Sequence, residues 1–175
     1  MLTGKPPHLK HFDYVGCHRY SLTFCTDQRW PFFKEQRYVD LVLSQISRAA
    51  KEQDFAVLTY CFMPDHVHLL VHGQSEAADC KRFITLAKQY SGYYFSKEIG
   101  EKLWQRYAYE RTLRKDEDTL AVARYIVENP VRAKLTTTVE EYPFVGSLIC
   151  NLKELLSSLP CSPDESGRLG GVRSG

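Results

Sequence analysis

The sequence predicts an α+β domain whose strands and helices follow the order β-α-β-β-α-β, with one additional helix towards the C-terminus. Two patterns give this order. Short runs rich in β-branched and aromatic residues predict the strands, and apolar residues three and four positions apart predict the helices. The chain has 175 residues, of which 43% are hydrophobic and 25% charged, which is typical of one folded domain.

The first half of the chain contains three predicted strands and one helix. Aromatic and β-branched side chains predict the first strand over residues 14–25, and apolar residues at helical spacing predict a helix over residues 36–53. Residues 55–62 are predicted to form the second strand. A Met-Pro-Asp turn at residues 63–65 then leads into an antiparallel third strand at residues 66–72.

The second half supplies the remaining helix and strand of this order. Residues 77–99 are predicted to form a helix that stops at Gly100, and residues 104–113 are predicted to form the fourth strand. The β-α-β-β-α-β order is the ferredoxin-like arrangement, in which helices cover one face of the sheet and leave the other face open.

An extra helix follows the fourth strand. It is predicted to begin near Asp116, whose carboxylate can cap free amides, and to end at Asn129 because Pro130 follows. We expect one domain over residues 1–150 and a flexible tail over residues 151–175, where Ser, Pro, Gly and Arg become frequent.

Composition excludes several classes of protein. No apolar run approaches the roughly 20 residues that span a membrane, and the N-terminus lacks the apolar core of a signal peptide, so we expect a cytoplasmic protein. A net charge of +2 does not by itself indicate a nucleic-acid-binding protein. Six cysteines without a Cys-x-x-Cys pair indicate reduced, mostly buried thiols, and they argue against a zinc ribbon.

Two histidines interrupt the apolar third strand. His66 and His68 are two positions apart, so both project from one face of the strand, while Val67 and Leu69 point into the core. Two parallel imidazoles on a rigid strand are suitable ligands for a divalent metal. The alternative is that both are half-exposed residues on a solvated face.

The last predicted helix adds a phenol and an amide. Tyr125 and Asn129 are four positions apart and therefore lie side by side on one edge of the helix. The amide oxygen of Asn129 can complete a metal site. In the alternative interpretation, Tyr125 covers the core and Asn129 only ends the helix before Pro130.

Together these segments carry a resemblance to a known family. Residues 63–70 (Met-Pro-Asp-His-Val-His-Leu-Leu), 103–106 (Leu-Trp-Gln-Arg) and 125–133 (Tyr-Ile-Val-Glu-Asn-Pro-Val-Arg-Ala) resemble the REP-associated tyrosine transposases. These belong to the single-tyrosine HUH transposase superfamily. The resemblance covers about residues 14–147, and Tyr-Pro-Phe at 142–144 is a mild departure from a Tyr-Pro-Trp-like segment.

The resemblance implies a nickase and transposase that cleaves single-stranded DNA near hairpins or palindromic elements. It implies that His66 and His68 bind Mg²⁺ or Mn²⁺ and that Asn129 completes the site. Tyr125 would be the nucleophile and would form a covalent 5′-phosphotyrosine. The expected partner is therefore structured single-stranded DNA rather than a membrane, and the protein is expected to act as a monomer or homodimer.

Two alternatives to this function remain open from the sequence. One is a metal-dependent phosphodiesterase that uses water as the nucleophile. The other is a non-catalytic DNA-binding protein with the same fold.

Two further features compete for the same roles. Tyr90 and Tyr94 share a helix face and could supply the nucleophile, although their spacing with Phe83 favours packing or base stacking. His72 has the same strand parity as the histidine pair, but its position at the strand end favours a solvated residue.

Five residues are predicted to contact DNA. Aromatic and basic residues alternate between residues 104 and 115, a mixture suited to stacking bases and binding phosphates. Two more arginines flank the predicted nucleophile, and one of them can instead pair with Glu128. The predicted DNA-binding residues are Trp104, Arg106, Arg111, Arg124 and Arg132.

Overall fold

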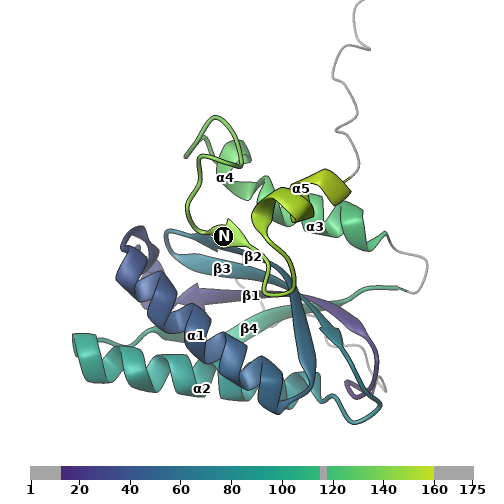
Figure 1. Cartoon of the computed structure of the whole chain (residues 1–175). Coiled ribbons are helices and arrows are strands. Elements are labelled where there is room, and N and C mark those ends of the chain that lie inside the picture. The colour runs from purple at the N-terminus through teal and green to yellow at the C-terminus, as the bar shows by residue number, and fades with distance from the viewer. Residues whose placement is uncertain (1–12, 115–117, 160–175) are drawn as a thin grey trace, which may run out of the picture.

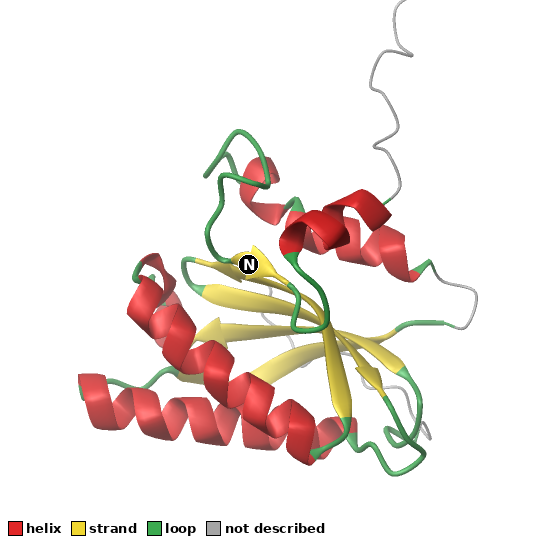
Figure 2. Cartoon of the chain, in the orientation of Figure 1, coloured by secondary structure: helices red, strands yellow, loops and turns green. Residues whose placement is uncertain are grey.

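The computed structural model describes residues 13–114 and 118–159, and within them five strands form one sheet (Figure 2). All neighbouring strands are antiparallel, in the order β4-β1-β3-β2-β5. The strands are β1 (Arg19–Thr26), β2 (Phe55–Met63), β3 (His66–Gly73), β4 (Trp104–Thr112) and β5 (Val145–Gly146).

Helices lie on both faces of this sheet (Figure 1). The helices α1 (Gln36–Glu52) and α2 (Cys80–Ile99) cover one face, and the short 3-10 turns η1 (Asp27–Arg29) and η2 (Phe32–Lys34) precede α1. The helices on the other face are α3 (Thr119–Val127), α4 (Asn129–Arg132) and α5 (Leu152–Ser158). The predicted α+β fold with a ferredoxin-like order is confirmed, but the face predicted to be open is partly covered.

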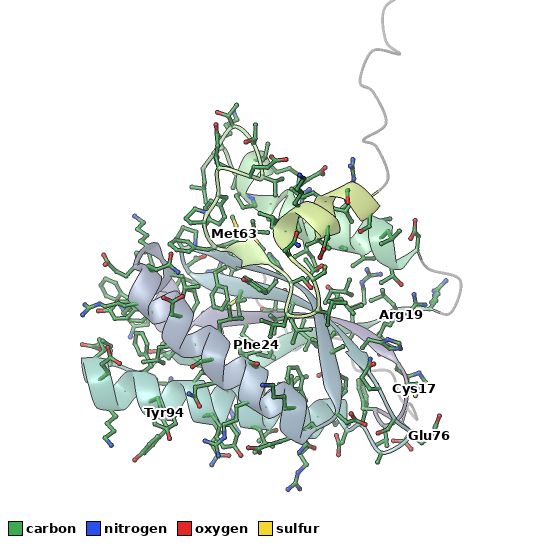
Figure 3. The ribbon with its side chains drawn as sticks, viewed as in Figure 1. Cys17, Arg19, Phe24, Met63, Glu76 and Tyr94 are labelled. Carbon is green, nitrogen blue, oxygen red and sulfur yellow. The ribbon has the colours of Figure 1, made fainter. Side chains whose placement is uncertain are left out.

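Strand alternation divides the apolar side chains between two clusters. Val67 and Leu69 of β3 face α1 and α2 and belong to the larger cluster, together with Phe24 of β1 (Figure 3). Leu70 and Met63 face the other way and pack in a smaller cluster with α3 and α5. The orientation predicted for Val67 and Leu69 is therefore confirmed.

The helix α2 starts and ends at residues suited to those positions. The side chain of Asp79 caps the helix by accepting a hydrogen bond from the backbone amide of Arg82 at 3.0 Å, and the helix begins at Cys80, three residues later than predicted. Gly100 ends the helix with a φ of 82°, a left-handed conformation that glycine adopts without steric strain.

The extra helix differs from its predicted bounds. Asp118 caps α3 by accepting a bond from the amide of Leu120 at 2.9 Å, whereas Asp116 lies outside the described residues. Pro130 does not end the helical segment but occupies the first turn of α4. Proline is tolerated there because a first-turn amide has no intrahelical acceptor to lose.

The predicted boundary at residue 150 lies too early. Asn151 and Glu154 cap α5 reciprocally, each accepting a bond from the other's backbone amide. Leu155 and Leu159 are buried in the smaller cluster, so the packed domain extends to at least Leu159. The rest of the predicted tail, residues 160–175, lies outside the described residues. None of the described helices is long and apolar enough to cross a membrane.

Candidate metal and nucleophile site

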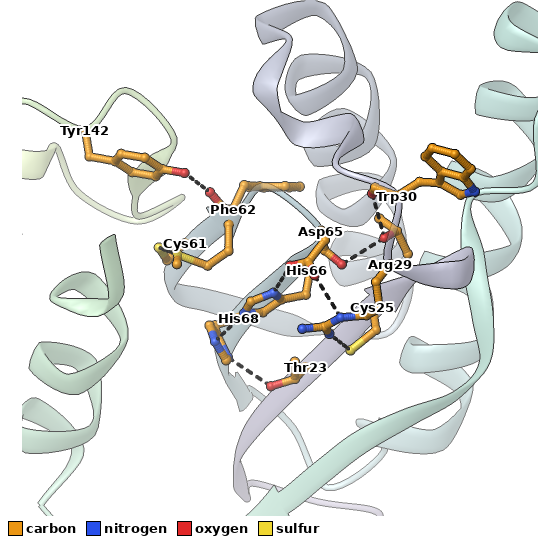
Figure 4. Close-up of polar contacts among 12 residues, drawn as sticks. Thr23, Cys25, Arg29, Trp30, Cys61, Phe62, Asp65, His66, His68 and Tyr142 are labelled. Atoms are coloured by element: carbon orange, nitrogen blue, oxygen red, sulfur yellow. Dashed lines mark hydrogen bonds and ion pairs between the residues drawn. The ribbon is translucent and has the colours of Figure 1, made fainter. Parts of the chain in front are cut away.

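The two histidine rings of β3 point at each other (Figure 4). The Nε2 atoms of His66 and His68 are 3.0 Å apart, and the perpendicular rings have centroids 4.7 Å apart. Both side chains lie on the sheet face opposite α1 and α2, as strand alternation predicted. A single small ion can therefore bind both nitrogens without a rearrangement of the strand.

The Nδ1 atom of each ring, which points away from the other histidine, contacts a neighbouring side chain. Asp65 places Oδ1 2.6 Å from Nδ1 of His66, and Thr23 of β1 places Oγ1 2.9 Å from Nδ1 of His68. Because a carboxylate only accepts hydrogen bonds, Nδ1 of His66 donates and the lone pair of this imidazole is on Nε2. Asp65 and Thr23 thus orient the two rings so that their Nε2 atoms face each other.

An arginine supports Asp65 in turn. The Nε atom of Arg29 lies 2.8 Å from Oδ2 of Asp65, and Nη1 of Arg29 lies 2.8 Å from Sγ of Cys25. Gln28 and Arg29 have φ values of 48° and 60°, a conformation that costs roughly 1–3 kcal/mol when a residue other than glycine adopts it. The left-handed backbone conformation of these two residues therefore places the guanidinium of Arg29 beside Asp65.

Burial keeps both imidazoles neutral. Desolvation lowers the pKa of His66, although the hydrogen bond that His66 donates to Asp65 opposes this effect. Desolvation also lowers the pKa of His68 to about 3, and the neighbouring His66 adds to the shift. A neutral imidazole is the form that binds a metal, because protonation consumes the coordinating lone pair.

These donors fit a divalent cation if an oxygen ligand joins them. Within residues 13–114 and 118–159, no group of three His, Cys, Asp or Glu side chains could hold a metal, so a third protein ligand at this pair would be of another residue type. Asn129 is suited to this role. Its Nδ2 atom donates to the backbone oxygens of Tyr125 at 3.2 Å and Ile126 at 3.1 Å, which leaves Oδ1 as the amide atom for a ligand.

The helix α3 packs beside the histidines. Cys61 and Met63 of β2 are the cross-strand partners of His68 and His66, and both belong to the cluster that α3 covers. The face of α3 that meets them consists of Val122, Ala123, Ile126 and Val127. Tyr125 lies off this buried face and is 61% exposed, so its hydroxyl group is accessible to a large substrate.

Arg132 lies over the ring of Tyr125. Its guanidinium carbon lies 3.9 Å from the centroid of the Tyr125 ring, and Nη2 donates to the backbone oxygen of Tyr125. After burial and the charge of His66, the charge of Arg132 is the next cause of the lowered pKa of His68. Figure 1 shows α4, which carries Arg132, on the same side of the sheet as α3.

The rival tyrosines lie on the opposite side. Tyr90 belongs to α2, donates to Oε2 of Glu52 at 2.7 Å and has the guanidinium of Arg48 4.2 Å from its ring centroid. Tyr94 lies on the outer surface of the α1 and α2 layer (Figure 3). The sheet separates both from the histidines. His72 is on the histidine face, opposite Arg19 in the register.

The predicted DNA contacts divide into distinct groups. Trp104 is only 6% exposed and donates to Oγ of Ser91 at 2.8 Å, so we correct its assignment from base stacking to the core. Arg111 pairs with Ser21 in the register, which places it on the histidine face, whereas Arg106 has the opposite strand parity.

The arginines near Tyr125 contact Glu128. Nη1 of Arg124 lies 3.5 Å from Oε1 of Glu128, so the ion pair considered from the sequence is present. Nη1 of Arg132 lies 3.4 Å from Oε2 of the same carboxylate. Arg132 therefore contacts both Glu128 and the ring of Tyr125.

Sequence reasoning did not identify three residues that organise the site: Thr23, Arg29 and Asp65. Asp65 directly precedes His66, so its proximity was visible in the sequence. Thr23 meets His68 only through the pairing of β1 with β3, and Arg29 reaches Asp65 through an unusual backbone turn. The last two contacts had no local sequence signal.

The fold and the site define a class of protein: a ferredoxin-like domain with a histidine pair on the sheet and a tyrosine on a helix beside it. The family model described as "Transposase IS200 like" matches residues 14–129. The protein belongs to this family of IS200-like transposases, as the sequence resemblance indicated.

Individual relatives agree with this assignment. A Haemophilus influenzae protein, provisionally named a REP-associated tyrosine transposase, is 25% identical over 126 residues, which cover 61% of this chain and 67% of that protein. A solved REP-associated tyrosine transposase bound to a REP hairpin has a TM-score of 0.66 at 18% identity, over 79% of this chain and 81% of that one. A transposase-like protein of Deinococcus radiodurans has a TM-score of 0.50 at 21% identity, over 70% and 97%. These two structures support the fold.

Proposed function

We propose that this protein cleaves single-stranded DNA beside a hairpin through attack by Tyr125, and rejoins strands through the resulting covalent intermediate. Its membership of the IS200-like transposase family supports a DNA-cleaving role. The hairpin bound to the similar solved transposase supports hairpin DNA as the substrate.

One observation carries the proposal: the Nε2 atoms of His66 and His68 converge to 3.0 Å on the sheet face beside the helix that bears Tyr125. Two neutral imidazoles whose orientation is fixed by hydrogen bonds at Nδ1 can bind a cation through their Nε2 atoms. With Asn129 they would hold Mg²⁺ or Mn²⁺. When bound, the cation would polarise the scissile phosphate.

The protein's own residues would perform the covalent step. The Tyr125 oxygen forms a bond to phosphorus, and the bond from phosphorus to the 3′ oxygen of the preceding nucleotide breaks. The phenol proton passes to solvent, and the leaving 3′ oxygen takes up a proton to become a hydroxyl. Arg132, which lies over the Tyr125 ring, is positioned to contact a phosphate near the attacking oxygen.

The strand β4 would hold the single-stranded DNA next to this site. Tyr109 and Arg111 pair in the register with Thr23 and Ser21, on the face that carries the histidines. Thr23 is also the residue that contacts His68. An aromatic and a basic side chain near the site suit one strand of DNA, because rings stack on bases and guanidinium groups bind phosphates.

Covalent adduct formation tests the proposal. The protein is incubated with end-labelled hairpin DNA that carries single-stranded flanks and with Mn²⁺, and the products are separated on a denaturing gel. We expect the label from the 5′-phosphate side to migrate with the protein. Tyr125→Phe should retain DNA binding and form no adduct, and Tyr90→Phe is the matched control that should form adduct normally.

Other results would contradict the proposal. Nicking without an adduct in the parent protein would identify water as the nucleophile. An adduct that persists in Tyr125→Phe would place the nucleophile elsewhere. Tight hairpin binding without any nicking would indicate a non-catalytic DNA-binding protein.

A further inference from the structure

A cavity with basic and aromatic lining residues lies on the other face of the sheet, between α2 and the start of β4. It has a volume of about 410 Å³, within the range of small-molecule sites. Its wall includes two lysines, one exposed tyrosine and three polar or aromatic neighbours: Lys88, Lys102, Tyr93, Gln89, Ser96 and Trp104. No acidic residue is among the residues that line it.

Lys88 places a positive charge in this cavity without a carboxylate beside it. Its Nζ atom donates to the backbone oxygens of Gln105 at 2.7 Å and Arg106 at 3.1 Å, and in the described parts of the chain it forms no ion pair. The ammonium also lies 6.0 Å from the centroid of the Phe24 ring. A half-buried cation without a counter-charge attracts an anion, and one of its three protons is not used by the two carbonyl groups.

Tyr93 supplies an aromatic surface at the rim. It is 61% exposed, and its ring meets Tyr94 edge to face at a centroid distance of 5.3 Å. The two tyrosines are neighbours in sequence, but Tyr94 lines a different cavity between α1 and α2. Of these two tyrosines, Tyr93 shares its cavity with Lys88 and Lys102, an arrangement that suits a nucleobase attached to a phosphate.

The cavity lies at the end of the sheet where the histidine site begins. Trp104 of its wall pairs with Thr26, and the amide of Thr26 donates to the backbone oxygen of Asp65 at 3.0 Å. Lys102 of its wall pairs with Asp27 at 2.7 Å, two residues before Arg29. The cavity and the histidine site therefore adjoin the same end of the sheet, around which a single strand of DNA would pass from one to the other.

We propose that this cavity binds one nucleotide of the single-stranded flank of the DNA, with its base on Tyr93 and its phosphate at Lys88 and Lys102. The inference rests on the proposed function, because it assigns part of the same substrate. It adds a second contact on the face opposite the histidines, so the flank wraps around the sheet end. Lys102 would exchange Asp27 for the phosphate or bind both.

Photocrosslinking and binding measurements test this assignment. Hairpin DNAs with 5-iodouracil at successive flank positions are irradiated with the protein, and crosslinked peptides are identified by mass spectrometry. We expect one flank position to crosslink to Tyr93. By fluorescence anisotropy, Tyr93→Ala should weaken binding of the flanked hairpin roughly tenfold, while Tyr94→Ala, the matched control, should leave it unchanged.

The charge is tested separately. Lys88→Met keeps the length and packing of the side chain and should lower the slope of log affinity against log salt by about 0.7, the value for one phosphate of a single strand. Neither Tyr93→Ala nor Lys88→Met should affect a hairpin that lacks flanks. Deoxynucleoside monophosphate at millimolar concentration should not displace the flanked DNA.

The outcomes separate this inference from the proposed function. If an adduct forms at Tyr125 but no flank position crosslinks to Tyr93 and both variants bind normally, the cavity assignment is wrong and the cleavage proposal stands. Displacement by the monophosphate would indicate a free-nucleotide site instead. Absence of both DNA binding and adduct would overturn both proposals.

Discussion

At the end of the sheet where β3 begins, the buried polar side chains on the two faces differ in their charge and in their hydrogen-bond partners. On one face, His66 and His68 are neutral, and each Nδ1 atom has a partner at 2.6 or 2.9 Å. On the other face, Lys88 is held only by two backbone oxygens and has no carboxylate partner among the residues that the structure describes. The first arrangement offers lone pairs, and the second offers a positive charge.

This difference indicates that the two faces bind ligands of opposite charge. Oriented neutral imidazoles favour a cation, because their desolvation has already excluded protons that would compete for the lone pairs. An uncompensated ammonium favours an anion, which would restore the interactions lost on burial. The proposed metal-dependent cleavage of DNA would use both, since the cation and the flanking phosphates would have to be held together.

Removal of either histidine of the proposed metal site should have the largest effect. We expect His66→Ala and His68→Ala to abolish adduct formation and to remove Mn²⁺ binding in calorimetric titration. Circular dichroism should show a retained fold, because the adjacent Val67 and Leu69 keep their core contacts. His72→Ala, on the same strand face, is the control and should bind Mn²⁺ like the parent. Equal Mn²⁺ binding by all variants would exclude the pair as ligands.

Loss of a hydrogen bond to the Nδ1 atom of a histidine should have a smaller effect. Asp65→Asn removes the charge that holds Nδ1 of His66 and pairs with Arg29, and should weaken Mn²⁺ binding roughly 10–100-fold. Thr23→Val keeps the shape of the side chain and removes one neutral hydrogen bond to His68, so its effect should be smaller. Calorimetry measures both. A larger loss of Mn²⁺ affinity in Thr23→Val than in Asp65→Asn would contradict the inference that Asp65 contributes more than Thr23.

Much of the fold could be predicted because its signals are local. The alternation in β3, the Gly100 helix end and the Met-Pro-Asp turn each occupy a few neighbouring residues. Pro130 misled the prediction because the rule that proline ends a helix does not apply in a first helical turn. The strand β5 is only two residues long and pairs with β2 from 80 or more positions away, so it gave no local pattern.

The candidate site was predictable only as far as its residues lie close in sequence. His66 and His68 share β3, and Tyr125 in α3 is only four positions from Asn129 at the start of α4. The contact between Thr23 and His68 depends on the register of two strands 45 residues apart. Trp104 was assigned to DNA because its aromatic and basic neighbours resemble a binding strand, but its indole NH meets Ser91 inside the core.

The two faces of β4 can be compared directly. Arg111→Ala removes a guanidinium from the histidine face and should reduce the salt slope of single-stranded DNA binding by about 0.7. Arg106→Ala, on the opposite parity, should change this slope less. Anisotropy titrations at several salt concentrations measure both. A larger effect of Arg106→Ala would mean that the strand of DNA follows the α2 side of the sheet instead.

The smallest effect is a pH dependence that belongs to Lys88. Burial lowers the pKa of Lys88 to about 8, with the charge of Lys102 adding to the shift and Cys25 opposing it. The charged fraction should therefore fall from about nine-tenths at pH 7 to about one-tenth at pH 9. A phosphate favours the charged form, so DNA binding above pH 8 must take up a proton, and affinity should decrease as the pH rises.

Substitutions at this position isolate the contribution of Lys88. Lys88→Arg keeps a positive charge at all these pH values, so affinity for the flanked hairpin should change little between pH 7 and pH 9. Lys88→Met should show an equally flat profile at lower affinity, because no titrating charge remains. Anisotropy in buffers of constant ionic strength measures the three profiles. If the parent profile is as flat as those of both variants, Lys88 does not contact the DNA, and the contrast between the two faces reduces to the histidine site alone.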